Sequence, residues 1–217
     1  MDTISHQKEF NKFHRGKFTA SEVFNLMGEK SGINTEGAKT YILEKVAEEL
    51  YDSEWVDDSY KGKEVEWGNL MEVDALEYYS LAFNVDVEKP QPQTPEWCSE
   101  VGCSPDGLVY PKDGKVYGLE IKSPYNPTNH VKHMMLKQES DLKKLTKKYY
   151  WQVVMCILIF GLDYYEFLSY DPRFVGANRM YVLPFHKVNI EQDMILLKQS
   201  LLDAVKEKHR ILNLINQ

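Results

Sequence analysis

The chain has 217 residues, of which 43% are hydrophobic and 27% charged, and its 26 Lys and Arg against 33 Asp and Glu give a formal net charge of -7. This length and composition predict one folded domain over residues 1–217 and exclude disordered, collagen-like and disulfide-scaffold proteins. The acidic balance also argues against a general polyanion binder, because nucleic-acid-binding proteins are usually basic overall. Three cysteines without a Cys-x-x-Cys pair predict buried free thiols, as in a reducing cytosol.

The N-terminal segment and the longest apolar run predict a cytoplasmic protein, in the cytoplasm of the host cell if a phage encodes it. The first ten residues, MDTISHQKEF, lack the positive and then apolar layout of a signal peptide. The apolar run over residues 153–160 is too short to cross a bilayer.

The first part of the chain has helical patterns. Thr19 or Ser21 is suited to cap a short helix that runs to about Met27. Apolar residues at helical spacing then predict helices over residues 37–51 and 66–83.

From residue 97 onward the pattern changes to alternation, which is typical of strands. Strands over residues 107–110 and 116–122 flank Asp113-Gly114, a strong hairpin signal. The remaining elements are expected in this order: a helix over 147–161 that ends on glycine, a strand over 164–170, a turn at Asp171-Pro172, a strand over 180–186, and a long amphipathic helix capped by Asn189. The order predicts an α/β fold with a central mixed β-sheet flanked by helices.

The second strand of the hairpin carries Glu120 and Lys122 on one face, because strand side chains alternate. Antiparallel pairing would bring Asp106, which precedes the first strand, close to Glu120. Converging carboxylates need a shared proton or a divalent cation. Mg²⁺ held there would polarise a phosphate oxygen, while Lys122 orients the attacking water or offsets the charge that develops on phosphorus. The pattern therefore indicates phosphodiester hydrolysis. The alternatives are an ordinary Pro-Asp-Gly turn and an exposed strand face with opposite charges.

A third carboxylate, Glu72, lies beside the apolar stripe of its predicted helix. A carboxylate at that position needs a partner, so it either faces the hairpin as a metal ligand or water relay, or is solvated at the edge of the stripe.

Six lysines form a local basic strip, which either contacts phosphate or is a solvated face: Lys132, Lys137, Lys143, Lys144, Lys147 and Lys148. In the same segment His130 and His133 lie three residues apart, and without an evident third metal ligand we expect them to face solvent or DNA. The aromatic cluster over residues 149–151 is expected in the core.

Several short motifs, taken together in order and spacing, resemble one known family. They are TASE at 19–22, Trp67-Gly68 followed by Glu72, CSPDGL at 103–108, LEIKSP at 119–124, YWQV at 150–153 and YDPR at 170–173. Together they resemble the phage lambda exonuclease group, or YqaJ-like viral recombinases, within the PD-(D/E)XK nuclease superfamily. The resemblance extends from about residue 12 to 185 and implies a restriction-endonuclease-like core.

The resemblance implies a role for each residue of the centre. Asp106 and Glu120 would bind catalytic Mg²⁺ with the backbone carbonyl of Ile121, and Lys122 would be the catalytic lysine. Mn²⁺ could substitute, and two ions per site are expected. Glu72 would assist at the metal. Gln152 would lie in the cleft near the water or the scissile phosphate, although a glutamine on an apolar helix is more often a satisfied core residue.

The resemblance also implies a pocket for the 5′-phosphate of a DNA end, formed by Ser21, Thr19 and a basic residue. The family's arginine usually stands seven residues before the serine, where this chain has His14. Either Arg15 or the pair His14 and Lys17 would then complete the pocket. An ordinary helix cap at Thr19 or Ser21 remains compatible with phosphate binding. From the basic strip, Lys132 and Lys137 would border the DNA channel.

The activity implied is a Mg²⁺-dependent exonuclease that degrades one strand of linear duplex DNA from its 5′ end. It would release mononucleotides and leave a 3′ single strand for recombination, working as a ring-shaped homotrimer with a single-strand annealing protein. Two alternatives stay open. One is a structure- or sequence-selective endonuclease or resolvase of the same superfamily, and the other is a non-catalytic DNA-binding protein whose carboxylates are structural.

Overall fold

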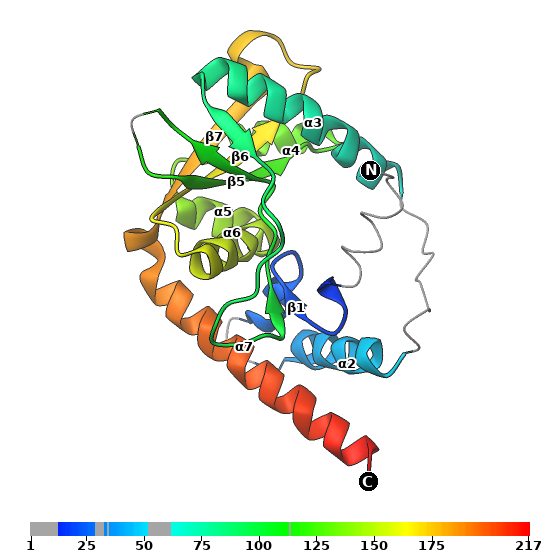
Figure 1. Ribbon diagram of the computed structural model, residues 1–217. Helices are drawn as coiled ribbons and strands as arrows, with labels where there is room; N and C mark the ends of the chain where they lie inside the picture. Colours follow the sequence, from blue (N-terminus) through cyan, green and yellow to red (C-terminus); the bar gives the residue numbers. More distant parts are fainter. Residues whose placement is uncertain (1–12, 29–32, 34, 52–61, 113) are drawn as a thin grey trace.

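The computed structural model describes residues 13–28, 33, 35–51, 62–112 and 114–217 (Figure 1). Its strands are β1 (Phe18–Thr19), β2 (Asp86–Glu88), β3 (Val101–Gly102), β4 (Gly107–Tyr110), β5 (Tyr117–Lys122), β6 (Tyr164–Tyr170) and β7 (Met180–His186). Its helices are η1 (Val23–Leu26), α2 (Glu36–Leu50), α3 (Lys63–Phe83), α4 (Pro127–Met134), α5 (Glu139–Leu145), α6 (Lys147–Phe160), η3 (Gly176–Arg179) and α7 (Lys187–Ile215). No helix among the described residues is long and apolar enough to cross a membrane.

The centre is a five-stranded sheet in the order β2-β4-β5-β6-β7. Strands β4 and β5 form the predicted antiparallel hairpin, whereas β5 and β6 are parallel and are connected through α4, α5 and α6. Strand β7 returns antiparallel to β6. The prediction of an α/β fold with a mixed sheet flanked by helices is therefore confirmed.

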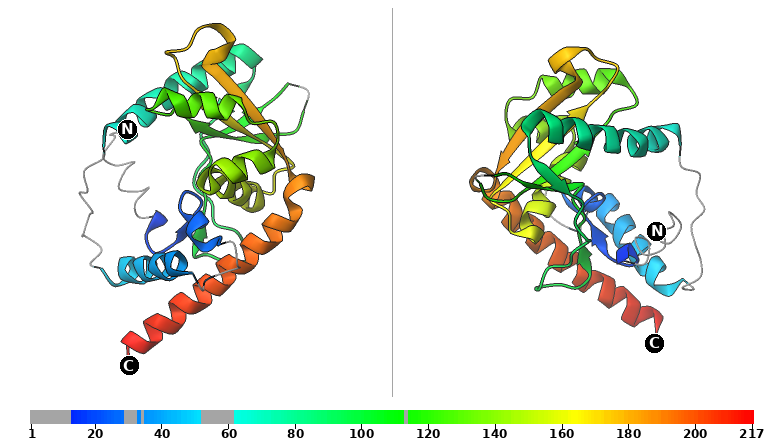
Figure 2. Two further views of the ribbon diagram at one scale, coloured as in Figure 1. Left: turned by 180° about the vertical axis from the view of Figure 1, so that it is seen from behind. Right: turned by 45° about the horizontal axis from the view of Figure 1, so that its top comes forward.

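Each face of the sheet packs against different helices (Figures 1 and 2). On one face Leu119 and Ile121 pack with Ala75 and Tyr79 of α3. On the other face the strands contribute to a larger core with α6, α7 and η1, which contains Phe167. Because β5 is covered on both faces, its residues 118–121 are all buried, including the acidic Glu120.

The boundaries of two helices illustrate how local residues act. Helix α6 ends at Gly161, whose φ of 66° is readily adopted by glycine, as predicted. Helix α7 begins earlier than expected, at Lys187 after His186, so the prediction of Asn189 as its cap is wrong. The Asn189 amide instead donates to Glu139 Oε1 at 2.9 Å, a partner 50 residues away.

The predicted short N-terminal helix is also corrected. Thr19 lies in β1, which pairs in parallel with β3, and its backbone N–H donates to Tyr41 Oη at 3.0 Å. The helix that follows is the single 3-10 turn η1, and no side chain caps it. The conformation of residues 18–19 is set by pairing with a strand some 80 residues further along the chain. Local propensity does not reveal such a pairing.

The expectation of three free thiols is wrong, because Cys103 and Cys156 form a disulfide, and only Cys98 is free. Both bonded cysteines are buried, as expected. Their Cα atoms lie 5.9 Å apart although the residues are 53 positions apart, so only the tertiary fold brings them together.

The C-terminal helix is tied to the N-terminal part of the chain through Lys208, which is 1% exposed. Its ammonium donates to the carbonyl of Gly16 and to Glu100 Oε2, both at 2.7 Å, and pairs with Glu49 at 2.5 Å. A buried ammonium needs such partners, and here they come from the turn before β1, the segment before β3, and α2.

Candidate active site

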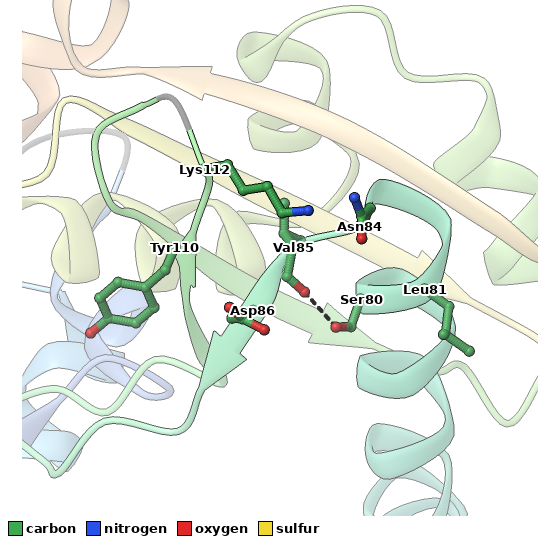
Figure 3. A pocket seen from close by; sticks show the side chains of 7 residues that line it. All are labelled: Ser80, Leu81, Asn84, Val85, Asp86, Tyr110 and Lys112. Carbon is green, nitrogen blue, oxygen red and sulfur yellow. Dashed lines mark hydrogen bonds between the residues drawn. The ribbon is translucent and has the colours of Figure 1, made fainter.

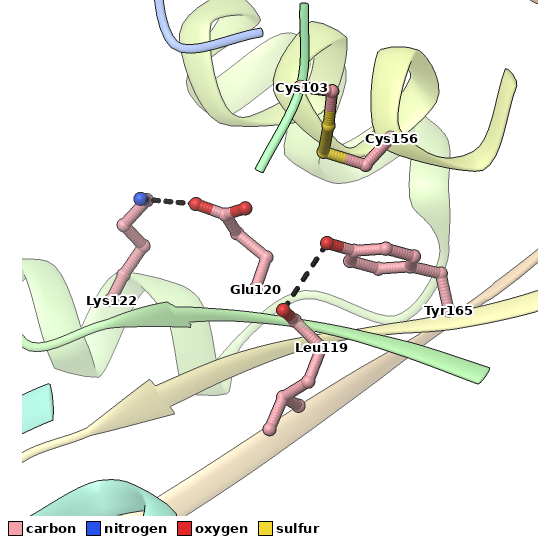
Figure 4. The surroundings of a disulfide bond; sticks show 6 residues. All are labelled: Cys103, Leu119, Glu120, Lys122, Cys156 and Tyr165. Carbon is pink, nitrogen blue, oxygen red and sulfur yellow. Dashed lines mark hydrogen bonds and ion pairs between the residues drawn. A yellow bond between two sulfur atoms is a disulfide. The ribbon is translucent and has the colours of Figure 1, made fainter. Parts of the chain in front are cut away.

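The hairpin brings together the three residues that the sequence singled out. Because Gly107 pairs with Leu119, Asp106 lies beside the central part of β5, and its Oδ2 accepts from the backbone N–H of Ile121 at 2.7 Å. On the same strand Lys122 Nζ donates to Glu120 Oε1 at 2.5 Å (Figure 4). The two carboxylates and the ammonium thus form one group at the end of β5.

Burial controls the charges in this group. Glu120 is 0% exposed, and burial together with the charge of Asp106 raises its pKa to about 8, against the opposing effect of Lys122. Burial also raises the pKa of Asp106, while Lys122 acts in the opposite direction. Burial disfavours the charge on Lys122, but Glu120 and Asp106 outweigh it and raise the pKa of its ammonium. In the absence of a further positive charge, the charged forms of both carboxylates are therefore disfavoured.

One carboxylate oxygen of the group has no partner. Glu120 Oε2 is buried without a hydrogen bond, one of three such side-chain atoms in the described part of the chain, with Trp67 Nε1 and Ser123 Oγ. A buried carboxylate oxygen without a partner is costly. A hard divalent cation would satisfy it, since carboxylate and carbonyl oxygens are the ligands that such ions prefer. Asp106, Glu120 and the Ile121 carbonyl therefore fit a metal of this kind.

Glu72 reaches this centre from α3 but does not complete a three-carboxylate cluster. No group of three or more His, Cys, Asp or Glu suited to a metal occurs among the described residues. Glu72 Oε1 instead accepts from Lys89 Nζ at 2.7 Å. Its charge nevertheless raises the pKa values of both Asp106 and Glu120, behind burial as the main cause, so it belongs to the same electrostatic centre.

Helix α6 lies next to the carboxylate centre, where its residue Tyr149 contacts Lys122. The Lys122 ammonium lies 5.1 Å from the centroid of the Tyr149 ring, which stacks on Phe167. Gln152 is one helical turn after Tyr149 and therefore on the same face of α6, with 8% of its surface exposed. The neighbouring Tyr150 and Trp151 are buried in the core, as predicted.

The disulfide links α6 to the segment that carries Asp106. Cys156 is one turn beyond Gln152, and Cys103 precedes Asp106 by three residues. Figure 4 shows the bond on the side of β5 to which the side chains of Glu120 and Lys122 point. It thus fixes the distance between two walls of the candidate site.

The residues predicted to hold a 5′-phosphate differ in exposure, and their basic members have partners elsewhere in the protein. Ser21 is exposed and Thr19 buried. Arg15 donates through Nε to the Glu48 carbonyl at 2.7 Å and through a terminal nitrogen to the carbonyl of Tyr51, at the C-terminal end of α2. Lys17 Nζ donates to the Ser99 carbonyl at 2.7 Å. His14 also has interaction partners, and its carbonyl accepts from the Lys17 N–H at 3.1 Å.

The basic strip is distributed over α4, α5, α6 and the segment between α4 and α5. Lys132, on α4, is exposed and donates to Asn129 Oδ1 at 3.3 Å, and Lys137 is exposed between α4 and α5. Two others are ion-paired, Lys143 to Asp193 at 2.7 Å and Lys144 to Asp141 at 3.6 Å.

His130 and His133 do not face solvent or DNA, so that prediction is wrong. They are 0% and 3% exposed, and the Nδ1 atoms of both rings lie 2.8 Å from Ser169 Oγ on β6. His130 Nε2 is bonded to the carbonyl of Asn178 at 2.8 Å. This face of α4 thus points inward, toward a serine of β6 that is far away in the sequence.

Arg173 supports the end of β5, a function that the sequence patterns did not indicate. It donates to both carboxylate oxygens of the fully buried Asp171 and to the carbonyls of Pro124 and Tyr125, which follow β5. Its guanidinium also lies 4.7 Å from the centroid of the Trp67 ring on α3. The motif after β6 therefore positions the strand that carries Glu120 and Lys122. The only sequence signal was the YDPR motif itself.

A shallow pocket elsewhere contains none of these residues. It lies beyond the C-terminal end of α3 and is lined by Ser80, Asp86, Tyr110 and Lys112 among others (Figure 3). The carboxylate centre, not this pocket, is thus the candidate active site.

A sequence model of the YqaJ-like viral recombinase domain matches residues 9–163. No curated protein matches the chain. Among solved structures, the alkaline exonuclease LHK-Exo from Laribacter hongkongensis is similar at 19% identity, with a TM-score of 0.74 over 96% of this chain and 95% of that one. Its complex with dAMP gives 0.75 at 19% identity, over 95% of each chain. A phage-related exonuclease from Haemophilus somnus 129PT gives 0.67 at 15% identity, over 95% of this chain and 99% of that one.

Proposed function

Because this chain belongs to the YqaJ-like viral recombinase domain family, we propose that it is a DNA nuclease and, more narrowly, a Mg²⁺-dependent 5′-to-3′ exonuclease on linear duplex DNA. It would release mononucleotides and leave a 3′ overhang for strand annealing. The observation that carries the proposal is the unpartnered, buried Glu120 Oε2 beside Asp106 and Lys122. The fold shared with alkaline exonucleases supports it, as does dAMP, a mononucleotide, in the LHK-Exo complex.

Asp106, Glu120 and the carbonyl of Ile121 would hold the divalent cation, which supplies Lewis acidity toward a phosphate oxygen and makes water more acidic. Two ions per site, with Mn²⁺ able to substitute, are part of the proposal. The N–H of Ile121 keeps the Asp106 carboxylate oriented. Glu72 lies at the edge of this oxygen set and would assist it.

Lys122 acts as a fixed positive charge. Since the flanking carboxylates raise its pKa, its Nζ stays protonated and stabilises the negative charge that develops on the phosphate oxygens as water adds and one P–O bond breaks. Gln152, on the adjacent face of α6, would orient the water or the scissile phosphate. The tyrosine between them, Tyr149, excludes water from one side of the ammonium.

Recognition of the DNA end would use Ser21 and Thr19 with Arg15, or with His14 and Lys17. Arg15 would first have to release the two carbonyls at the end of α2. Lys132 and Lys137 are exposed and would contact the duplex further away. A homotrimer and a single-strand annealing partner complete the proposal.

The test is a time course on linear duplex DNA with a 5′-phosphate or a 5′-hydroxyl, labelled at either end, in Mg²⁺ and in EDTA. We expect progressive Mg²⁺-dependent loss from the 5′ end and intact covalently closed circles. Cleavage of the circles would instead indicate the endonuclease alternative, and no cleavage of either substrate a binding protein. Size-exclusion chromatography with light scattering tests the trimer independently.

A further inference from the structure

A second lysine lies next to the carboxylate centre, and neither sequence motif nor family match indicates it. Lys89 directly follows β2, whose last residue, Glu88, pairs with Leu108 of β4. Lys89 therefore lies alongside the segment that contains Asp106. A Cβ on Gly107 would lie 2.6 Å from Val87 and 3.7 Å from Leu76, which shows that β2, β4 and α3 are in contact at this point.

The Lys89 side chain is held by one carboxylate and is otherwise accessible. Its Nζ pairs with Glu72 Oε1 at 2.7 Å, and its side chain is 64% exposed against 26% for Glu72. Partial burial opposes its charge, but Glu72, and after it Asp106 and Glu120, raise the pKa of the ammonium. An exposed ion pair of this kind contributes little to stability, so exchanging its partner costs little.

The charge of the site creates a need for such a cation. The proposed cation would offset Asp106 and Glu120, but a DNA phosphate beside the cleavage centre still meets Glu72 in a protein of net charge -7. Lys122 donates to the buried Glu120 and is assigned to the reacting phosphate, and the Arg173 guanidinium donates to Asp171 and to two backbone carbonyls. Of Lys89, Lys122 and Arg173, Lys89 has the most exposed side chain.

We propose that Lys89 binds a backbone phosphate of the DNA next to the cleavage centre, leaving Glu72 when DNA arrives. The inference rests on the proposed function in that DNA is the ligand. The released Glu72 carboxylate then faces the metal site, so phosphate binding and completion of the acidic centre occur together. Lys89 is a binding residue in this scheme, and Lys122 remains the catalytic one.

The experiment measures how DNA affinity depends on salt. Fluorescence anisotropy of a labelled duplex, in Ca²⁺ with a gel to verify that the DNA stays intact, compares the unaltered protein with Lys89→Gln. Losing one phosphate contact lowers the slope of log affinity against log salt by about 1. Between 50 and 200 mM salt, the affinity of the unaltered protein should therefore fall about 3- to 4-fold more than that of Lys89→Gln.

Two further variants make the result specific. Lys115→Gln removes another exposed lysine that is paired to a carboxylate, Asp163 at 3.0 Å, at the turn end of the hairpin, and should leave the slope unchanged. Lys89→Arg should retain the slope. An unchanged slope in Lys89→Gln, or an equal decrease in Lys115→Gln, overturns the inference. The unaltered protein could show the Lys89-dependent slope of log affinity against log salt and yet hydrolyse no DNA. That result would overturn the proposed function but not the inference about Lys89.

Discussion

The buried pair of histidines under β6 predicts a loss of stability in mild acid. Burial, and after it the nearby charges of His130, Lys122 and Lys132, lowers the pKa of His133 from 6.5 to about 4. The unfolded chain therefore binds a proton at this position more readily than the folded protein does. The contribution of His133 to the free energy of unfolding is therefore fully present above pH 6.5 and is lost as the pH falls toward 4.

The size of the effect follows from the two pKa values. At pH 5 the unfolded histidine is almost fully protonated while the folded one is mostly neutral, so the free energy of unfolding falls by about 2 kcal/mol relative to pH 7. The full difference, reached below pH 4, is about 3 kcal/mol. This is a large share of the stability of a typical domain.

The assay is urea unfolding followed by tryptophan fluorescence at pH 7 and pH 5, for the unaltered protein and for His133→Gln. Glutamine keeps a donor for Ser169 but takes up no proton, and the carboxylates titrate alike in both proteins. We expect the unaltered protein to lose about 2 kcal/mol more than the variant between the two pH values. Equal losses in the two proteins would refute the reasoning.

Three other predictions concern the site and its support. Lys122→Ala should lower the rate constant of single-turnover digestion by roughly 10²- to 10³-fold. An unaltered rate constant would exclude Lys122 from catalysis. Circular dichroism serves as the control for folding. Cys156→Ser removes the disulfide with Cys103 and should lower the free energy of unfolding by about 2–5 kcal/mol, measured in urea without reductant. A variant as stable as the parent would contradict a stabilising role of the bond. Gly118→Ala places a Cβ 2.1 Å from the Tyr165 ring and should cost about 1–3 kcal/mol or more, and a thermal melt with an unchanged midpoint would show that the ring can move away.

The central hairpin could be predicted because its determinants are local. Alternation along β5 fixes the common face of Glu120 and Lys122, and antiparallel pairing places Asp106 beside them. The helix α4 could also have been found from the sequence, because Asn126 caps it and proline occupies its first turn. These features depend only on residues close together in the chain.

The features that the sequence did not reveal depend on distant contacts. In their buried positions His130 and His133 both contact Ser169, which lies more than 35 residues away from each. Lys89 belongs to no motif, and only the pairing of β2 with β4 brings it near Glu72. Local patterns contain no information on such pairings.

The anchoring of Lys208 has a consequence for how the protein is made. Its bond to Gly16 joins residues 192 positions apart, so the ribosome adds the lysine roughly 10 to 40 s after the glycine at bacterial rates of about 5–20 residues per second. During that interval Glu49 and Glu100 lack the ammonium that they share in the finished molecule. The contact of Gly16 with α7 is therefore among the last to form although the glycine is made early, and a chain that ends before α7 would lack it.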